Sequence, residues 1–318
     1  MQERISRRAA LQRIYQALVA AGAATFLGFD DLLAADKTTE DRLRLVWLHG
    51  SSCSGCSVSF LNIESVPVVD ILTRFVSLVF HPDISLATGS QVLDLHKQLL
   101  ASRLPYVFVM EGGIPVGMPH ACMMADRPIA QWAEELARGA VACVAAGTCA
   151  AAGGVPRMKG TDTGSRTLGE LLRERGISTP VVNLPGCPMK PEHLVYTVLH
   201  VAHRNRLPPL DKRGRPVQFF AHTVHERCVH YSDFQEERFA QHIGEDGCLL
   251  RLGCQGPVTR NDCLVLGHNG NVNTCIRAGH PCVGCASEHF PRQIMMHAHG
   301  ENRWIRGKLM DWTEGTSS

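Results

Sequence analysis

Short apolar runs alternate with longer amphipathic stretches from about residue 43 to residue 206. The apolar runs are four to six residues long and are bounded by glycine, proline or polar residues, as buried parallel strands are. These predicted strands are Leu43–Leu48, Val76–His81, Tyr106–Met110, Ala140–Ala145 and Val181–Leu184. The predicted helices that alternate with them are Val58–Phe75 (with Pro67 inside), Val92–Ala101, Pro128–Arg138, Leu168–Arg175 and His193–Arg206. This alternation predicts an α/β fold with an open, doubly wound parallel sheet.

Cysteines follow three of the five predicted strands. Cys53 and Cys56 come directly after the first strand. Cys149 follows the fourth strand and Cys187 the fifth, whereas Glu111 follows the third. The carboxyl ends of parallel strands meet at one edge of a doubly wound sheet, and such folds bind their ligands there. We therefore expect four thiols and one carboxylate to gather at the same edge, although they are far apart in the sequence.

The pattern changes from about Arg215 onward. Strand and helix signals fade, turn-forming residues become frequent, and seven cysteines lie between Cys228 and Cys285. A segment with so little apolar periodicity needs another source of order, and metal binding supplies folding free energy. We expect two domains: an α/β domain over residues 36–214 and a largely irregular, metal-binding domain over residues 215–318.

Residues 1–35 have the features of an export signal. Arg7 and Arg8 precede an apolar run, Ala17–Phe29, which is too short to span a bilayer and is typical of a signal sequence. The arginine pair matches the twin-arginine pattern of the route that exports folded proteins. An amphipathic N-terminal helix is the alternative interpretation. No later segment is apolar enough to cross a membrane, and the polar residues 311–318 predict no C-terminal membrane anchor.

The charge balance and the cysteine count narrow the possible functions. The formal net charge is only +2 over 318 residues, so the chain lacks the basic surplus expected of a nucleic-acid-binding protein. Its 13 cysteines are an odd number, and a chain of this length can bury a core without disulfides. Twin-arginine export also suits metal centres, because they are assembled in the reducing cytoplasm before the folded protein crosses. We therefore interpret most of the cysteines as metal ligands.

Eleven cysteines and one histidine form three candidate sets of four ligands. The first set is Cys53, Cys56, Cys149 and Cys187, the second is His225, Cys228, Cys248 and Cys254, and the third is Cys263, Cys275, Cys282 and Cys285. Four thiolates at one sheet edge favour a 4Fe–4S cube for the first set. Cys53 and Cys56 by themselves would also fit a thioredoxin-like redox pair or half of a zinc site. For the other two sets, spacing alone leaves zinc and iron–sulfur clusters equally open.

The remaining cysteines and the neighbouring histidines have weaker claims to a metal. His222 and His230 lie close to His225 in the sequence and compete with it for the histidine position of the second set. Cys143 lies in an apolar strand and is expected to be a small buried side chain. Cys122 has no assigned role.

At these motifs the sequence resembles the small subunits of nickel-iron hydrogenases, over most of the chain after the signal. The matching segments are Cys53-Ser54-Gly55-Cys56-Ser57-Val58-Ser59, Glu111-Gly112-Gly113-Ile114-Pro115, Gly147-Thr148-Cys149-Ala150, Pro185-Gly186-Cys187-Pro188, His225-x-x-Cys228, Gly253-Cys254-x-Gly256-Pro257 and Ala278-Gly279-His280-Pro281-Cys282-x-x-Cys285. The resemblance implies a flavodoxin-like first domain and three iron–sulfur clusters in a row. The first ligand set would hold a proximal 4Fe–4S cluster, the second a distal 4Fe–4S cluster, and the third a medial cluster between them.

The resemblance also implies the reaction and the partners. Hydrogen would be split at the nickel-iron centre of a large subunit, so no catalytic residue is expected on this chain. Electrons would pass through the three clusters to a cytochrome or another external acceptor, as in an uptake hydrogenase. For Glu111 two roles are open: a surface or helix-capping acid, or a hydrogen-bonding or proton-relay group near the large subunit.

Two positions depart from patterns found in that family. Many members have a proline where this chain has Cys275 and hold a 3Fe–4S medial cluster. The additional thiolate predicts a 4Fe–4S medial cluster here, with a lower potential, and hence three 4Fe–4S clusters in all. Oxygen-tolerant members carry two extra cysteines around the proximal cluster, whereas Gly55 and Gly154 occupy those positions here. The resemblance therefore implies an ordinary proximal cube without that form of oxygen tolerance.

The predicted export signal indicates where the protein works and helps to choose among alternative functions. A twin-arginine signal predicts a periplasmic protein, or one on the outer face of the cytoplasmic membrane. A hydrogen-sensing hydrogenase subunit is one alternative, but sensors work in the cytoplasm. A related iron–sulfur subunit of a respiratory complex is a second, but those proteins usually lack the cysteine-rich C-terminal domain. A zinc-stabilised binding module is a third, and it would be colourless.

Overall fold

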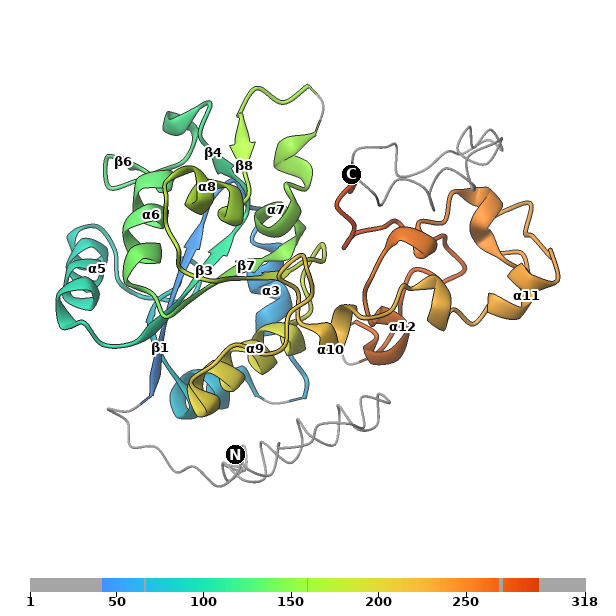
Figure 1. Ribbon diagram of the computed structural model, residues 1–318, viewed down its shortest axis with the longest axis horizontal. Coiled ribbons are helices and arrows are strands. Elements are labelled where there is room, and N and C mark those ends of the chain that lie inside the picture. The colour runs from blue at the N-terminus through green and yellow to red at the C-terminus, as the bar shows by residue number, and fades with distance from the viewer. Residues whose placement is uncertain (1–41, 66, 159, 269–270, 292–318) are drawn as a thin grey trace.

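The computed structural model describes residues 42–65, 67–158, 160–268 and 271–291. Within these ranges the chain forms an α/β unit, and a second unit of short helices and loops lies beside it (Figure 1). The export signal predicted for residues 1–35 and the C-terminal residues 292–318 lie outside the described residues. Among the helices of the described residues, none is both long and apolar enough to cross a membrane.

A five-stranded parallel sheet forms the centre of the α/β unit. Its strands are β1 (Leu43–His49), β2 (Val76–Phe80), β3 (Tyr106–Glu111), β7 (Ala142–Ala146) and β9 (Val181–Leu184). They lie in the order β2-β1-β3-β7-β9, and each neighbouring pair is parallel. This is the order of the flavodoxin-like doubly wound fold. The structure confirms the predicted fold class and all five predicted strands.

Helices cover both faces of the sheet, because successive strand residues point to opposite sides. Leu45 and Trp47 face one layer, which contains α3 (Gly55–Leu61) and α9 (Pro191–Arg204). Val46 and Leu48 face the other layer. That layer contains α5 (Ser90–Ser102), α6 (Ile129–Gly139) and α8 (Leu168–Glu174). The strands are therefore buried on both faces, which is why they read as continuous apolar runs.

The predicted helix Val58–Phe75 is wrong. Helix α3 ends at Leu61, and the chain becomes helical again only after Pro67, in the single turns α4 (Val68–Asp70) and η2 (Ile71–Phe75). Proline lacks an N–H and clashes with the preceding turn, so it begins a helix but does not continue one.

Several short elements surround the edge of the sheet where the strands end. They are η3 (Pro119–Ala121), α7 (Gly147–Ala152), η4 (Val155–Arg157) and the antiparallel pairs β4 (Ile114–Pro115) with β8 (Ser165–Arg166) and β5 (Met123–Met124) with β6 (Arg127–Pro128). Helix α7 follows directly from the carboxyl end of β7 and carries the predicted ligand Cys149.

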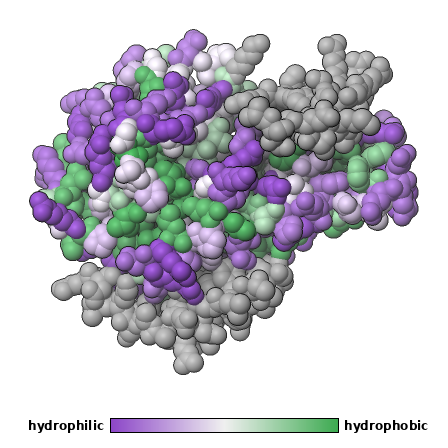
Figure 2. Space-filling model, in the orientation of Figure 1, coloured by the Kyte–Doolittle hydropathy of each residue, from purple (hydrophilic) through white to green (hydrophobic). Residues whose placement is uncertain are grey.

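The second unit is irregular, as the sequence predicts. Its short helices are α10 (Val217–Phe220), η5 (His225–Arg227), α11 (Tyr231–Gln235), η6 (Leu249–Leu252), η7 (Gly256–Val258) and α12 (Cys263–Leu266). Its apolar cluster is small and consists of Val224, Ile276 and Cys282, with Cys228, Cys254, Cys263 and Leu264 packed against them. Candidate metal ligands therefore take the place of much of an ordinary core. On the face seen in Figure 2, the outer end of this unit is mainly hydrophilic.

Candidate metal centres

The first ligand set gathers at the carboxyl edge of the sheet. Cys53 lies in the loop after β1, Cys56 in α3, Cys149 in α7 and Cys187 directly after β9. Burial raises the pKa of the Cys187 thiol to about 11, with further contributions from the nearby Cys149 and Cys53. Burial also raises the pKa of Cys56, together with the charges of Glu111, Cys149 and Cys187. The four thiols thus face one another, as expected from strand order.

Glycines keep space open beside three of these thiols. A Cβ on Gly154 would lie 2.8 Å from the Cys149 Sγ, and one on Gly55 would lie 3.1 Å from the Cys53 Sγ. A Cβ on Gly147 would overlap the Cys56 Sγ. Gly147 and Gly154 also have positive φ angles of 82° and 52°, which glycine adopts without strain. The result is a cradle of thiols with room for a bulky group, and it fits a four-thiolate cluster.

Glu111 holds the loop that carries Cys53 and Cys56. The carboxylate is 2% exposed, so it is not a surface acid. Its Oε1 accepts hydrogen bonds from Ser52 Oγ (2.8 Å) and the Cys56 N–H (3.1 Å). Its Oε2 accepts from the Ser57 N–H (3.0 Å) and Ser57 Oγ (2.6 Å). Glu111, at the end of β3, therefore accepts hydrogen bonds from backbone N–H groups in the first turn of α3, which have no partner within the helix.

A histidine beside Glu111 keeps that carboxyl ionised. Burial by itself would raise the pKa of Glu111, but hydrogen bonds from His49, Ser57 and Ser52 outweigh it and lower the pKa to about 2. The His49 Nε2 lies 3.2 Å from Glu111 Oε2 and 2.9 Å from Ser57 Oγ. A buried carboxylate with this many donors remains an anion throughout the physiological pH range.

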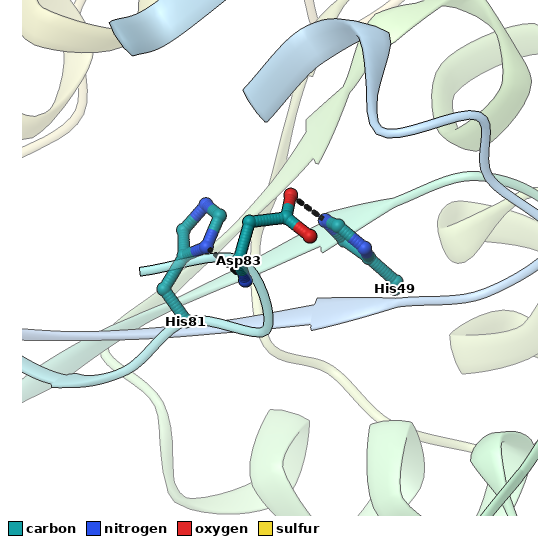
Figure 3. A group of neighbouring side chains, drawn as sticks. All are labelled: His49, His81 and Asp83. Atoms are coloured by element: carbon teal, nitrogen blue, oxygen red, sulfur yellow. Dashed lines mark hydrogen bonds and ion pairs between the residues drawn. The ribbon is translucent and has the colours of Figure 1, made fainter. Parts of the chain in front are cut away.

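His49 also belongs to a group with His81 and Asp83, at the ends of β1 and β2 (Figure 3). The ligand atoms of these three side chains lie within 4.8 Å of one another, close enough to hold a metal ion. His49 Nε2 lies 3.7 Å from Asp83 Oδ2, but it is closer to Ser57 Oγ and to Glu111. Within the group, His81 Nδ1 accepts the Asp83 N–H at 3.1 Å. We interpret the group as support for Glu111.

The second ligand set lines a single hollow in the second unit. His225, Cys228, Cys248 and Cys254 all contribute to the wall of this hollow. Burial raises the pKa of the Cys254 thiol to about 11, with additional contributions from Cys228 and Cys248. Burial lowers the pKa of His225 and so favours the neutral imidazole, which is the form that binds metals.

The two competing histidines have other partners. His222 pairs with Glu226 at 3.3 Å on the surface. His230 lines the hollow as well, but its Nδ1 interacts with Asp233 Oδ2 at 3.1 Å. The His225 ring instead packs against the edges of Tyr231 and Phe234, which orient it. His225 is therefore the best-placed histidine for the second set.

The third ligand set lies between the other two. Cys263 begins α12, and burial raises the pKa of its thiol to about 12; the nearby Lys190 opposes this change, whereas Cys285 and Cys275 add to it. Cys282 is buried beside Cys285 and Cys263, and the charges of both add to the increase in its pKa that burial causes. Cys275 is exposed, yet its charge acts on both Cys263 and Cys285. The four thiols of this set thus lie close enough together for their charges to interact.

Direct bonds connect each site to the next. The backbone of Cys187, from the first set, lies close enough to the Cys285 thiol of the third to oppose the increase in its pKa that burial causes. Thr148, beside Cys149, donates its hydroxyl to the Cys285 carbonyl. At the other end, the Cys282 N–H donates to Cys254 Sγ at 3.4 Å, which joins the third set to the second. The sites therefore follow one another in a row, with the third set in the middle.

The two remaining cysteines lie outside these sites. Cys143 is fully buried in β7, and burial raises the pKa of its thiol to about 12, as expected for a core residue. Cys122 donates weakly to the His49 carbonyl at 3.7 Å. All 13 cysteines are free thiols, so the clustered ones are not cross-linked as disulfides.

The comparisons with known proteins assign the family. The family model for the C-terminal part of NiFe/NiFeSe hydrogenase small subunits matches residues 220–298. A second model, NADH ubiquinone oxidoreductase, 20 Kd subunit, matches residues 53–201. The periplasmic NiFeSe hydrogenase small subunit of Desulfomicrobium baculatum is 32% identical and covers 78% of this chain and 84% of its own length. The hydrogenase-2 small chain of Escherichia coli K12 is 34% identical, with 94% of this chain and 83% of the relative covered.

The chain belongs to the nickel-iron hydrogenase small subunit family. Solved structures agree with this. A reduced, active NiFeSe hydrogenase from Desulfomicrobium baculatum matches with a TM-score of 0.76 at 31% identity, over 81% of this chain and 100% of that one. The NiFeSe hydrogenase of Desulfovibrio vulgaris Hildenborough matches with a TM-score of 0.74 at 33% identity, over 79% and 95%. Members of the hydrogenase small subunit family form part of heteromeric oxidoreductases.

One buried group near the ligands of this hydrogenase small subunit was not predicted from the sequence. Lys190 and His193 both contact the carboxylate of Asp262, at 2.7 Å and 3.0 Å. Lys190 comes three residues after Cys187, and Asp262 directly precedes Cys263. The charges of these residues and their closeness to ligand positions in the sequence could have marked them as candidates. Nothing in the sequence indicates that their side chains contact one another.

Proposed function

We propose that this chain relays electrons in a nickel-iron uptake hydrogenase, from hydrogen oxidation in the large subunit to an external acceptor. The observation that supports the relay most directly is the contiguity of the three ligand sets. Thr148, beside Cys149, bonds the Cys285 carbonyl and joins the first site to the third, and the Cys282 N–H bonds Cys254 Sγ and joins the third to the second. Isolated structural metal sites would not need this arrangement, whereas electron transfer between centres depends on their proximity.

Each set fits an iron–sulfur cluster. We assign Cys53, Cys56, Cys149 and Cys187 to the proximal cluster, Cys263, Cys275, Cys282 and Cys285 to the medial cluster, and His225, Cys228, Cys248 and Cys254 to the distal cluster. Bound clusters would supply one-electron redox chemistry, at potentials set by ligand charge, hydrogen bonds and burial. His225 contributes a neutral ligand where cysteine would contribute an anion, which raises the potential at the distal end and favours the exit of electrons there.

The surface around the proximal ligands suits the large subunit. Val58 and Leu61 of α3 are 52% and 39% exposed, although they are apolar and lie beside Cys56 in the same helix. Val155 and Met158 are also exposed, a few residues after Cys149. Exposed apolar side chains of this kind mark protein interfaces. We place the large subunit over this end and a cytochrome or another acceptor at the distal end.

The complex that contains this chain provides the test of the function. We expect the purified chain to be accompanied by a larger, nickel-containing subunit, and the complex to reduce a viologen dye under hydrogen but not under nitrogen. A visible absorption near 400 nm that bleaches on reduction should accompany this activity. A colourless protein that contains zinc, or a brown complex that lacks nickel and hydrogen-dependent activity, would exclude the proposed function.

The medial site should hold a four-iron cube because Cys275 supplies a fourth thiolate. The native complex should contain about twelve iron atoms per small subunit, four for each of three cubes. In the Cys275→Pro variant the count should fall to about eleven, and a 3Fe–4S electron paramagnetic resonance (EPR) signal should appear in the oxidised protein. The Cys122→Ser variant is the matched control and should leave both unchanged. About eleven iron atoms in the native protein would contradict the assignment.

The arginine pair in the N-terminal segment should direct export of the folded complex. We propose that the chain functions in the periplasm or on the outer face of the cytoplasmic membrane. Replacement of Arg7 and Arg8 by lysine should leave the assembled small subunit in the cytoplasm, because the twin-arginine route recognises that pair. The Arg13→Lys variant keeps the pair and should be exported normally. Unchanged periplasmic content in the double variant, measured by cell fractionation and immunoblotting, would refute this route.

A further inference from the structure

A buried ion pair joins the two units beside the medial site. Lys190, which directly precedes α9, is 1% exposed, and its Nζ lies 2.7 Å from the Oδ1 of Asp262. Asp262 directly precedes α12 in the second unit, and its Oδ1 also faces His193 Nε2 at 3.0 Å. In Figure 1, α9 and α12 lie on either side of the junction between the units. The pair therefore spans the junction between the proximal and the medial ligands.

A lysine in this position needs a physical reason. Removing an ammonium and a carboxylate from water costs free energy, and one contact between them rarely returns all of it. An ammonium has three N–H donors, and among the described residues Asp262 is the hydrogen-bond acceptor that Lys190 Nζ meets. A well-packed pair of apolar side chains would join the two units at a lower cost in free energy. The presence of a charged pair at this position therefore needs an explanation.

The ammonium lies beside the medial ligands in the fold. Asp262, whose Oδ1 is 2.7 Å from the Lys190 Nζ, directly precedes the ligand Cys263 at the start of α12. The positive charge is therefore held, away from water, next to the segment that carries one of the medial thiols. In a dry interior, such a charge acts far more strongly than it would in water.

We propose that Lys190 sets the reduction potential of the medial centre, its buried ammonium offsetting part of the negative charge that four thiolates and an added electron bring there. This inference rests on the proposed electron-relay function. The thiolate of Cys275 lowers the potential of the medial centre, because it adds negative charge. The Lys190 ammonium raises it again, because it stabilises the more negative, reduced state. Asp262 acts as a positioning residue, since it holds the ammonium in place.

The test is a redox titration of the intact complex, followed by EPR. In the Lys190→Met variant the equilibrium constant for reduction of the medial centre should fall at least about tenfold, which is about 59 mV for a one-electron couple. The proximal and distal potentials should stay close to their native values. The Lys190→Arg variant retains the charge and should restore most of the medial potential. The Lys97→Met variant removes an exposed lysine from α5 and should change none of the three potentials.

The double variant Lys190→Met/Asp262→Asn separates charge from packing. It removes both charges, so the medial potential should lie between those of the native protein and Lys190→Met. If the unpaired charge of Asp262 prevents the Lys190→Met variant from folding, the double variant, which lacks that charge, provides the measurement of the medial potential instead. A native medial potential in Lys190→Met, or in the double variant if Lys190→Met does not fold, would overturn this inference and leave the relay intact. A native complex without three titrating clusters would instead overturn the proposed function.

Discussion

Replacement of Cys187 by alanine should cause the largest loss of function of any single substitution considered for this chain. The thiol lies near Cys149 and Cys53 in the first ligand set. Without it, the proximal cube that we propose would lose one of its four ligands, at the proposed entry point for electrons. We expect hydrogen-dependent dye reduction to fall at least about 100-fold, since even changes to residues that only orient metal ligands cost about 10- to 100-fold. The iron content should fall by about four atoms per chain.

The matched control for this substitution is Cys143→Ala. Like Cys187, Cys143 is a free thiol, but it is buried at the centre of the sheet and belongs to none of the ligand sets. We expect this variant to keep its iron and its activity, with a loss of stability of only about 1 kcal/mol from the smaller side chain. Iron analysis and dye reduction on both variants provide the measurement. Near-native activity in Cys187→Ala would show that Cys187 is not a proximal ligand.

Replacement of Glu111 by alanine should have the second largest effect. The carboxylate is the acceptor for Ser52, for the Cys56 N–H and for both donors of Ser57, and it also pairs with His49. The substitution would leave these donors buried without an acceptor beside the loop that carries Cys53 and Cys56. Breaking a buried charged network of this kind costs about 3–5 kcal/mol. We expect a lower thermal midpoint for the complex and partial loss of the proximal cluster.

Two further variants make the Glu111 prediction specific. Glu111→Gln keeps the shape but sets an NH2 group against one pair of donors, so its effect should be intermediate. Glu135→Ala removes an exposed carboxylate that pairs with Arg127, and the thermal midpoint should hardly change, because exposed pairs contribute little. Native iron content and thermal midpoint in Glu111→Ala would show that other groups hold the loop.

The low pKa of Glu111 also predicts how the protein responds to acid. The pKa is lowered to about 2 in the folded chain, below its ordinary value, so the carboxylate stabilises the fold when it is ionised. This stabilisation, about 3 kcal/mol, is complete above the unfolded-state pKa of about 4.3 and is lost as the pH falls from there toward 2. The Glu111→Gln variant lacks this titration, so its thermal midpoint should fall less steeply over the same pH range.

Local pattern in the sequence determined the sheet and the membership of the ligand sets. All five strands were predictable, because a parallel strand buried on both faces is a continuous apolar run. The gathering of Cys53, Cys149 and Cys187 followed from strand order, since parallel strands present their carboxyl ends at one edge. The helix predicted over Val58–Phe75 was wrong because its apolar periodicity was given more weight than Pro67, which cannot continue a helix.

Tertiary structure alone decided which buried groups contact one another. Cys282 meets Cys254 because the second unit folds back on itself, and Lys190 meets Asp262 across 72 residues of sequence because that unit packs against α9. The many donors to Glu111 likewise come from a loop more than 50 residues away. Periodicity records which face of an element is buried, but it carries no information about which buried groups meet. Long-range packing makes that choice, and so the environment of each ligand could be known only from the fold.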